Sequence, residues 1–128
     1  MTEKFFYQAK VLNVIDGDTL DLLVDLGFNI HHQIRVRLNG LNTPEKKSPD
    51  IREKELGLKA TSFTSDWVAR HPVVHVSTSK DKKEKFGRIL ALIYSDDIKT
   101  ACLNEDLIDS GNARAYNGEA RGGWFDTK

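Results

Sequence analysis

The first third of the chain alternates apolar and polar positions with the period of two that is typical of β-strands. The alternating segments are residues 5–15, 19–26 and 28–38, and an Asp-Gly pair and a Leu-Gly pair separate them. Glycine and aspartate are common turn residues. The pattern therefore predicts three strands that follow one another in a meander.

The period changes after a polar loop that follows the third predicted strand. Within residues 52–69, Leu56, Ala60, Phe63 and Trp67 recur at intervals of three or four. This spacing places them on one face of an α-helix, because an α-helix has 3.6 residues per turn. The segment is predicted to be an amphipathic helix that packs on the sheet.

Two further apolar segments, residues 73–78 and 88–94, predict a hairpin whose long tip is the basic stretch 79–87. A second helix is expected within residues 100–111, ending at Gly111, because glycine commonly follows the last turn of a helix. The apolar residues on one side of this helix are Leu103, Leu107 and Ile108. Cys102 is expected to pack within it, and residues 112–128 are expected to be mostly irregular.

Five strands with a helix after the third match the element order of the OB-fold, a small and partly open five-stranded barrel. The predicted fold is therefore β-rich α+β, with a five-stranded barrel and two helices in a single domain spanning residues 1–128. A chain of this length buries enough apolar surface to fold without disulfides or structural metals.

Composition adds limits on partners and location. Lys plus Arg equals Asp plus Glu at 19 each, so any site for a polyanion must come from local clustering. The single cysteine excludes an internal disulfide and suits a reducing compartment. No segment is long and apolar enough to span a bilayer, so no membrane partner is expected. The cytoplasm is the expected location, and secretion is the alternative if a signal peptide has been removed.

Two short motifs carry candidate chemistry, and each also has an ordinary explanation. Asp16 and Asp18 flank a glycine, which is typical of a turn but also suits a hard cation that takes oxygen ligands. Arg35 and Arg37 lie on the same face of their predicted strand. They form either a solvated surface pair or a phosphate site, because the guanidinium fork matches phosphate oxygens.

A third candidate is the basic stretch between the last two predicted strands. Most such runs are solvated loops. This one ends in Phe86, which offers a ring for contact, followed by a glycine and by Arg88 at the start of a strand. The stretch is therefore a candidate contact surface for a polyanion as well as a solvated loop.

Read in order, five segments resemble the staphylococcal (micrococcal) nuclease, or thermonuclease, family over nearly the whole chain. They are "IDGDT", "RVRLNGLNTPE", "KELGLKATSF", "EKFGRILALIY" and "SGNARAY". The resemblance implies an OB-fold whose active site uses Ca²⁺ to cleave the phosphodiester bonds of DNA and RNA, leaving 3′-phosphates. Single-stranded or locally opened nucleic acid is the expected partner.

Carried over residue by residue, the resemblance assigns roles to individual positions. The implied metal site consists of Asp18, Asn42 and the backbone carbonyl of Thr43. The implied catalytic residues are Glu45 as the general base and Arg37 and Arg88 as the arginines that hold the phosphate. The residues expected to contact nucleic acid are Arg35, Lys82, Lys83, Lys85, Phe86 and Tyr116.

The chain departs from the family pattern in three places. Asn42 stands where the family usually has an aspartate ligand, and Phe86 stands where it often has a tyrosine. The C-terminal helix of the family is expected to be truncated, because only "NGEARGGWFDTK" follows Tyr116. These departures put calcium affinity, end preference and stability in question.

Asn42 supports an alternative function from another class. The chain would then be a catalytically weakened or inactive nuclease-like domain that binds nucleic acid or a protein partner. One observation argues against this alternative function. Four residues that make chemical sense as one catalytic unit are all present: Asp18, Arg37, Glu45 and Arg88. The sequence favours the enzyme and sets no oligomeric state.

Overall fold

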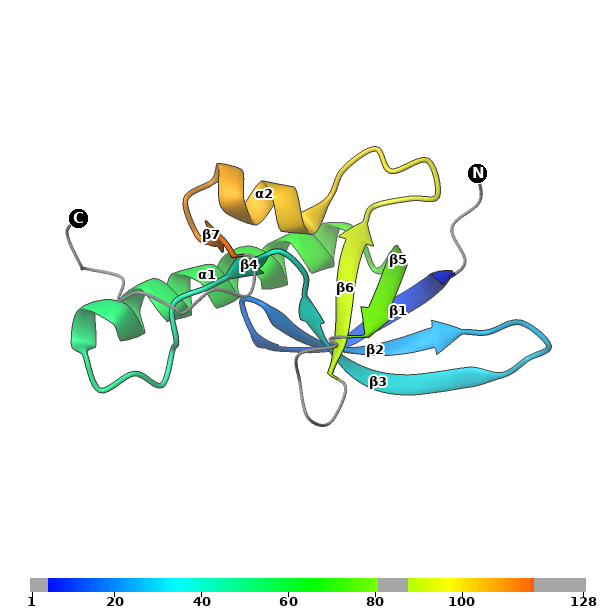
Figure 1. Ribbon diagram of the computed structural model, residues 1–128, viewed down its shortest axis with the longest axis horizontal. Helices are drawn as coiled ribbons and strands as arrows, with labels where there is room; N and C mark the ends of the chain where they lie inside the picture. The colour runs from blue at the N-terminus through cyan, green and yellow to red at the C-terminus, as the bar shows by residue number, and fades with distance from the viewer. Residues whose placement is uncertain (1–4, 81–87, 117–128) are drawn as a thin grey trace.

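The computed structural model describes residues 5–80 and 88–116 (Figure 1). The elements along the chain are β1 (Phe6–Asp16), β2 (Thr19–Asp25), β3 (His31–Leu38), β4 (Leu41–Asn42), α1 (Ile51–Arg70), β5 (Val73–Lys80), β6 (Ile89–Tyr94), α2 (Leu103–Asp109) and β7 (Arg114–Ala115). Among the described residues, no helix has the length and apolar character needed to cross a membrane.

Five of the strands form a closed barrel in the order β1-β2-β3-β6-β5, and β1 also pairs with β5 to complete the ring. The link between β3 and β6 within this ring is a short parallel ladder, in which Arg37 faces Leu90 and Leu38 faces Ala91. The expected five-stranded barrel with two helices is confirmed. The barrel is closed, however, whereas a partly open one was expected.

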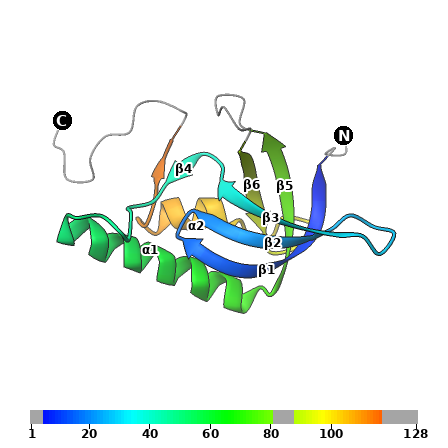
Figure 2. The ribbon, with the colours of Figure 1, turned by 90° about the horizontal axis from the view of Figure 1, so that it is seen from below.

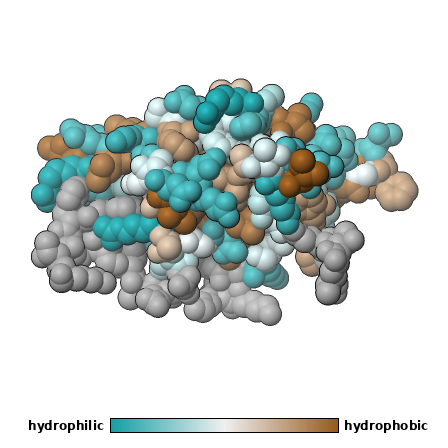
Figure 3. All heavy atoms as spheres, turned by 90° about the horizontal axis from the view of Figure 1, so that it is seen from above, coloured by the Kyte–Doolittle hydropathy of each residue, from teal (hydrophilic) through white to brown (hydrophobic). Residues whose placement is uncertain are grey.

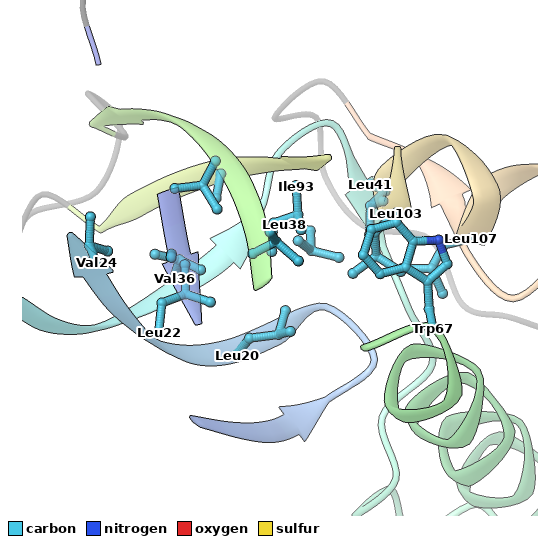
Figure 4. Packing of buried hydrophobic residues seen from close by; sticks show 14 of the residues in the cluster. Leu20, Leu22, Val24, Val36, Leu38, Leu41, Trp67, Ile93, Leu103 and Leu107 are labelled. Atoms are coloured by element: carbon cyan, nitrogen blue, oxygen red, sulfur yellow. The ribbon is translucent and has the colours of Figure 1, made fainter. Parts of the chain in front are cut away.

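Inward-facing residues of the strands fill the barrel, as the alternation of the sequence predicts (Figure 4). The fully buried members include Leu20, Leu22, Val36, Leu38, Val74, Val76 and Ile93. At one end Trp67 of α1 packs with Leu41 and with Leu103 and Leu107 of α2 (Figure 4). Each such side chain contributes about 1.5–3 kcal/mol through burial, so this core fixes both helices to the barrel.

Helix α1 packs through most of the expected face, since Ala60 and Trp67 are buried and Phe63 packs against the core, but Leu56 does not. It begins after Asp50, whose side chain accepts a hydrogen bond from the Arg52 backbone N–H at 2.9 Å. Its buried residues are Gly57, Ala60, Thr64 and Trp67. Leu56, expected on the buried face, is 36% exposed, and that expectation was wrong. The small residues lie where loop backbone comes too close for a leucine side chain.

Two other parts of the chain differ from expectation. The polar loop after β3 and the expected irregular tail meet as strands β4 and β7, in which Leu41 faces Ala115 and Asn42 faces Arg114. Cys102 is buried but precedes α2, which begins at Leu103 and is shorter than expected. Gly111 follows the end of α2 with a φ of +83°, as expected of a glycine after a helix.

The antiparallel hairpin of β5 and β6 is confirmed. Of the expected basic tip, 79–87, the first two residues belong to β5, and residues 81–87 lie outside the described residues, as do residues 117–128, where a truncated C-terminal helix was expected.

Candidate functional site

The turn between β1 and β2 places Asp18 at the edge of the barrel, where the residue is 8% exposed. Its carboxylate accepts hydrogen bonds from the Thr19 hydroxyl at 3.1 Å and from the Thr43 backbone N–H at 3.4 Å. Its backbone carbonyl accepts from the Leu38 N–H at 2.8 Å. These bonds tie the turn to the end of β3 and to the loop after β4, so the carboxylate has a fixed position.

Helix α1 holds this turn from the other side. The Thr64 hydroxyl donates a hydrogen bond to the Gly17 carbonyl at 2.7 Å. A Cβ at Gly17 would come within 2.9 Å of the Ala60 Cβ and 3.1 Å of the Thr43 Cγ2. Gly17 is therefore needed for the close approach of helix, turn and loop. The sequence predicts only a turn at this glycine, because nothing local indicates its distant neighbours.

Arg37 lies on β3 opposite Thr19 of β2. Its Nη2 atom is 3.6 Å from Asp18 Oδ2 and donates a hydrogen bond to Asn42 Oδ1. The Asn42 residue is 4% exposed on the short strand β4. Arg37 therefore joins the two side chains that were assigned to the metal site, and the amide oxygen of Asn42 already has a donor.

Glu45 is exposed in the loop between β4 and α1. Its backbone N–H donates to Glu53 Oε2 at 3.3 Å, and the loop crosses α1 at Gly57, where a Cβ would come within 2.4 Å of the Lys46 backbone nitrogen. This close packing sets the position of Glu45. The role of Gly57 in holding this loop could not be read from the sequence, since a glycine in a helix gives no sign of which backbone passes it.

Asp18, Arg37 and Glu45, but not Asn42, lie on one open pocket of ≈ 240 Å³. It is lined by Asp16, Asp18, Thr19, Arg37, Thr43, Pro44, Glu45, Lys46 and Lys47. A second pocket of ≈ 360 Å³ is lined by Thr19, Arg35, Val36, Arg37 and Arg88. Thr19 and Arg37 line both, so the pockets adjoin. The three arginines of the second pocket thus lie next to the three carboxylates of the first, Asp16, Asp18 and Glu45.

Arg35 is engaged in an ion pair as well as lining the second pocket. Its Nε atom is 2.8 Å from Asp21 Oδ1, and its side chain is 61% exposed. The hydrogen bond from Arg35 holds the pKa of the Asp21 carboxyl below its usual value, and the same bond raises the pKa of Arg35. The ion pair uses Nε and Nη2 of the guanidinium, and the Arg35 side chain as a whole stays largely accessible to solvent.

The remaining predicted residues lie elsewhere. Tyr116 follows β7, is half-buried, and donates its backbone N–H to the Gly40 carbonyl at 2.8 Å, but it lines neither of the two pockets. Four residues expected to contact nucleic acid lie outside the described part of the chain: Lys82, Lys83, Lys85 and Phe86.

The donors on the first pocket fit a hard divalent cation in their chemistry. Asp16, Asp18 and Thr43 bring oxygen atoms, which Ca²⁺ and Mg²⁺ prefer as ligands. Within residues 5–80 and 88–116, no three His, Cys, Asp or Glu side chains gather as a metal site. A cation here would therefore depend on backbone carbonyl oxygens and water in addition to carboxylate.

Comparison with known families bears on this arrangement. A family model described as "Staphylococcal nuclease homologue" matches residues 35–123, which include Arg35, Asn42, Glu45 and Arg88. The chain belongs to this family. Asp18 precedes the matched span, and the hairpin of β2 and β3 brings it to the members of the span that form the pocket.

Individual relatives of this staphylococcal nuclease homologue agree with the assignment. The chain is 33% identical to the thermonuclease of Staphylococcus hyicus over 106 residues, which are 83% of this chain and 57% of that protein. It is 33% identical to the thermonuclease of Staphylococcus intermedius over 105 residues, 82% of this chain and 57% of that protein. Protein ParB of Escherichia coli is 28% identical over 120 residues, 89% of this chain and 60% of that protein. The chain thus spans little more than half of the length of these relatives.

Proposed function

We propose that this chain is a Ca²⁺-dependent nuclease that hydrolyses phosphodiester bonds of DNA and RNA and leaves 3′-phosphates. The observation that carries the proposal is the meeting of Asp18, Arg37, Thr43 and Glu45 on one pocket. They come from the β1–β2 turn, from β3 and from the loop after β4, so the pocket is assembled by the fold.

The arginines are assigned to the phosphate. Arg37 lines both pockets and Arg88 lines the second, so a phosphodiester held between them would place its phosphorus beside the carboxylates of the first pocket. One guanidinium group can donate two parallel hydrogen bonds to two oxygens of the same phosphate. Guanidinium groups also stabilise the negative charge that grows on these oxygens in the transition state. Electrostatic stabilisation of this kind is usually the largest single contribution to rate acceleration.

Glu45 is assigned the role of general base. Its exposed carboxylate accepts a proton from a water molecule, and the water oxygen forms the new bond to phosphorus. The bond from phosphorus to the 5′ oxygen then breaks, and that oxygen takes a proton from solvent. The phosphate stays on the 3′ oxygen, as the proposed product requires.

A cation would be held by Asp18, by the carbonyl oxygen of Thr43 and by Asn42 as a neutral ligand. When bound, Ca²⁺ would polarise the phosphoryl group as a Lewis acid. The hydrogen bonds from Thr19 and Thr43 to the Asp18 carboxylate orient this ligand without neutralising it. Such support from neighbouring groups is typical of protein metal ligands.

Single-stranded or locally opened DNA and RNA are the proposed substrates. The second pocket, at ≈ 360 Å³, is within the size range of sites for small ligands, and with the adjoining first pocket of ≈ 240 Å³ it suits a nucleotide of one strand. A base-paired segment would have to open for its phosphate to reach between Arg37 and Glu45.

The hydrogen bond between Arg37 and Asn42 favours a second candidate function. Asn42 brings no charge, and its amide oxygen already accepts from Arg37. In this second account the site binds nucleic acid, or the domain binds a protein partner, and cleavage is weak or absent. The two accounts differ in catalysis and agree on the fold.

Digestion of single-stranded DNA with Ca²⁺, with Mg²⁺ and with a chelator tests the proposal. Cleavage with Ca²⁺ that a chelator abolishes is the expected result, giving fragments that terminal transferase cannot extend at the 3′ end until a phosphatase has removed the 3′-phosphate. Intact DNA under all three conditions, together with measurable DNA binding, would establish the binding domain instead.

A further inference from the structure

The hairpin of β2 and β3 extends beyond the barrel and ends in an apolar tip (Figure 2). The two strands pair from Thr19 opposite Arg37 to Asp25 opposite His31. At the turn, Leu26 is 44%, Phe28 97% and Ile30 54% exposed. Hydrophobic atoms accordingly appear at the end of the molecule where this hairpin lies (Figure 3). The described residues leave the ring of Phe28 without packing inside the domain.

The backbone at the tip is strained where Phe28 lies. Phe28 has a φ of 56° and Asn29 a φ of 60°, and the Ile30 N–H donates to the Gly27 carbonyl at 2.9 Å to close the turn. Turns with two positive φ angles favour asparagine and glycine, and a bulky residue there is unfavourable. The backbone of Phe28 is therefore in an unfavourable conformation, and its ring gains no burial in return. Strain of this kind often points to function.

One face of the hairpin leads from this tip to the arginine pocket. Alternate residues of β3 share a face, so Arg37, Arg35, Gln33 and His31 follow one another along it. The last three are exposed, and the first two line the second pocket. At about 3.3 Å per residue, the six steps from Arg37 to His31 cover about 20 Å. The face can therefore accompany an extended strand away from the pocket.

The acidic residues on this face are both engaged. Asp21 is paired with Arg35 at 2.8 Å, and Asp25 Oδ1 accepts a hydrogen bond from the Gly27 N–H at 2.8 Å. The distal half of the face carries no lysine or arginine on β2 or β3. A nucleic acid strand would therefore be held near the tip by stacking, with phosphate attraction confined to the arginine end.

We infer that the β2–β3 hairpin is a second contact for single-stranded nucleic acid, in which a base beyond the cleaved nucleotide stacks on Phe28. This inference rests on the proposed function, because the strand is placed by its phosphate at Arg37. OB-fold proteins bind oligonucleotides over strands 2 and 3, and stacking on aromatic rings tolerates any base. The continuous face from the arginine pocket favours a nucleic acid strand as the occupant.

The substitution Phe28→Asn separates stacking from folding. Asparagine tolerates a positive φ, so this variant removes the ring and relieves strain, and its melting temperature should equal or exceed that of the parent. Binding is measured on the full chain with chelator present, using oligothymidylates of about 4 and about 16 nucleotides, the limits of typical OB-fold site sizes. The affinity for the longer one should fall on the order of tenfold, as expected for one lost base stack.

Two further readouts identify the lost contact as stacking. The affinity for the short oligonucleotide should not change, because it ends before the tip. The dependence of binding on salt should keep its slope, since stacking releases no counterions. Phe28→Trp should restore the affinity for the longer oligonucleotide or raise it.

Equal binding of the longer oligonucleotide by Phe28→Asn and by the parent would overturn the inference. So would a dimer of the parent that Phe28→Asn dissociates without loss of DNA affinity, since the tip would then bind a second copy of the chain. Cleavage of the short oligonucleotide with Ca²⁺ is measured in parallel. Its absence in the parent would count against the proposed nuclease function, whereas the binding comparison in chelator decides the role of Phe28.

Discussion

Arg37 Nη2 donates a hydrogen bond to Asn42 Oδ1, and the same nitrogen lies 3.6 Å from Asp18 Oδ2. One guanidinium therefore bridges β3, the β1–β2 turn and the short strand β4. Asn42, the residue that Arg37 contacts on β4, is a neutral amide at a position where the family pattern has an aspartate. If the site holds a cation, the negative charge available to it is lower by one carboxylate.

The substitution Asn42→Asp should restore that charge. Calcium affinity rises with the number of charged oxygen ligands, so we expect the Ca²⁺ concentration for half-maximal cleavage to fall. DNA affinity in chelator should change little. A calcium titration of parent and variant measures the shift, and Asn39→Asp, which adds the same charge at a residue that is not assigned to the metal site, is the control. Superimposable activation curves for parent and Asn42→Asp would remove Asn42 from the metal site.

The substitution Gly57→Ala should displace the loop that carries Glu45. The new Cβ would come within 2.4 Å of the Lys46 backbone nitrogen and 2.5 Å of the Glu45 carbonyl carbon, and backbone atoms cannot move aside as a side chain can. We expect a loss of about 1–3 kcal/mol in the free energy of unfolding, typical of overpacking. Cleavage should fall by on the order of a hundredfold if Glu45 is misplaced.

Urea unfolding and initial cleavage rates measure the two effects of Gly57→Ala. Leu58→Ala, at the next residue of α1 and on its exposed side, is the matched control and should leave the cleavage rate unchanged. Alanine is intrinsically favoured over glycine in a helix, so a stabilised Gly57→Ala would show that the loop does not pack as described.

The ion pair of Asp21 and Arg35 should make stability depend on pH in the acid range. The pKa of Asp21 is lowered in the folded state by the hydrogen bond from Arg35, so the native state binds this proton less readily than the unfolded chain does. The stabilisation is complete above the unfolded pKa of about 3.9 and is lost as pH falls through the lower folded value.

Asp21→Asn should therefore melt at a lower temperature than the parent near neutral pH, and the difference should shrink below about pH 4. Thermal unfolding followed across this range measures it. Asp97→Asn, which changes an exposed aspartate, is the control and should show no such convergence. A difference that stays constant down to the acid limit would mean that the pair does not perturb the Asp21 carboxyl.

Binding to single-stranded DNA should weaken steeply with salt. Phosphate contacts release counterions, and Arg37→Ala should lower the slope of log affinity against log salt by about 1. Substituting Lys82, Lys83 and Lys85 together should lower it further, since these residues were predicted to contact the backbone. Fluorescence anisotropy at several salt concentrations measures the slope. A flat dependence in the parent would contradict a groove that contacts phosphates.

The fold could be predicted from the sequence because its signals are local. Alternation in the strands and the three-to-four spacing in α1 indicate which residues face the core, and five strands with a helix after the third leave few arrangements. The ladder of β4 and β7 could not be predicted, because only two residues on each side form it and they come from distant parts of the chain. The buried face of α1 was misplaced at Leu56 because loop backbone, rather than side chains, packs there.

The residues of the site could be named through their resemblance to a family, and the structure brings Asp18, Arg37, Thr43 and Glu45 to one pocket. The hydrogen bond of Arg37 to Asn42 could not be foreseen, since it depends on the angle between β3 and β4. The same is true of Gly17 and Gly57, whose importance lies in how closely other segments pass them.

The most direct test of the proposed chemistry is the rate of single-stranded DNA cleavage by Glu45→Gln in saturating Ca²⁺. Glu55→Gln, an exposed glutamate of α1, is the matched control. If Glu45 is the general base, its variant should be slower by about a hundredfold or more while Glu55→Gln matches the parent, since base catalysis contributes on this scale. Cleavage by Glu45→Gln at the parental rate would contradict the account.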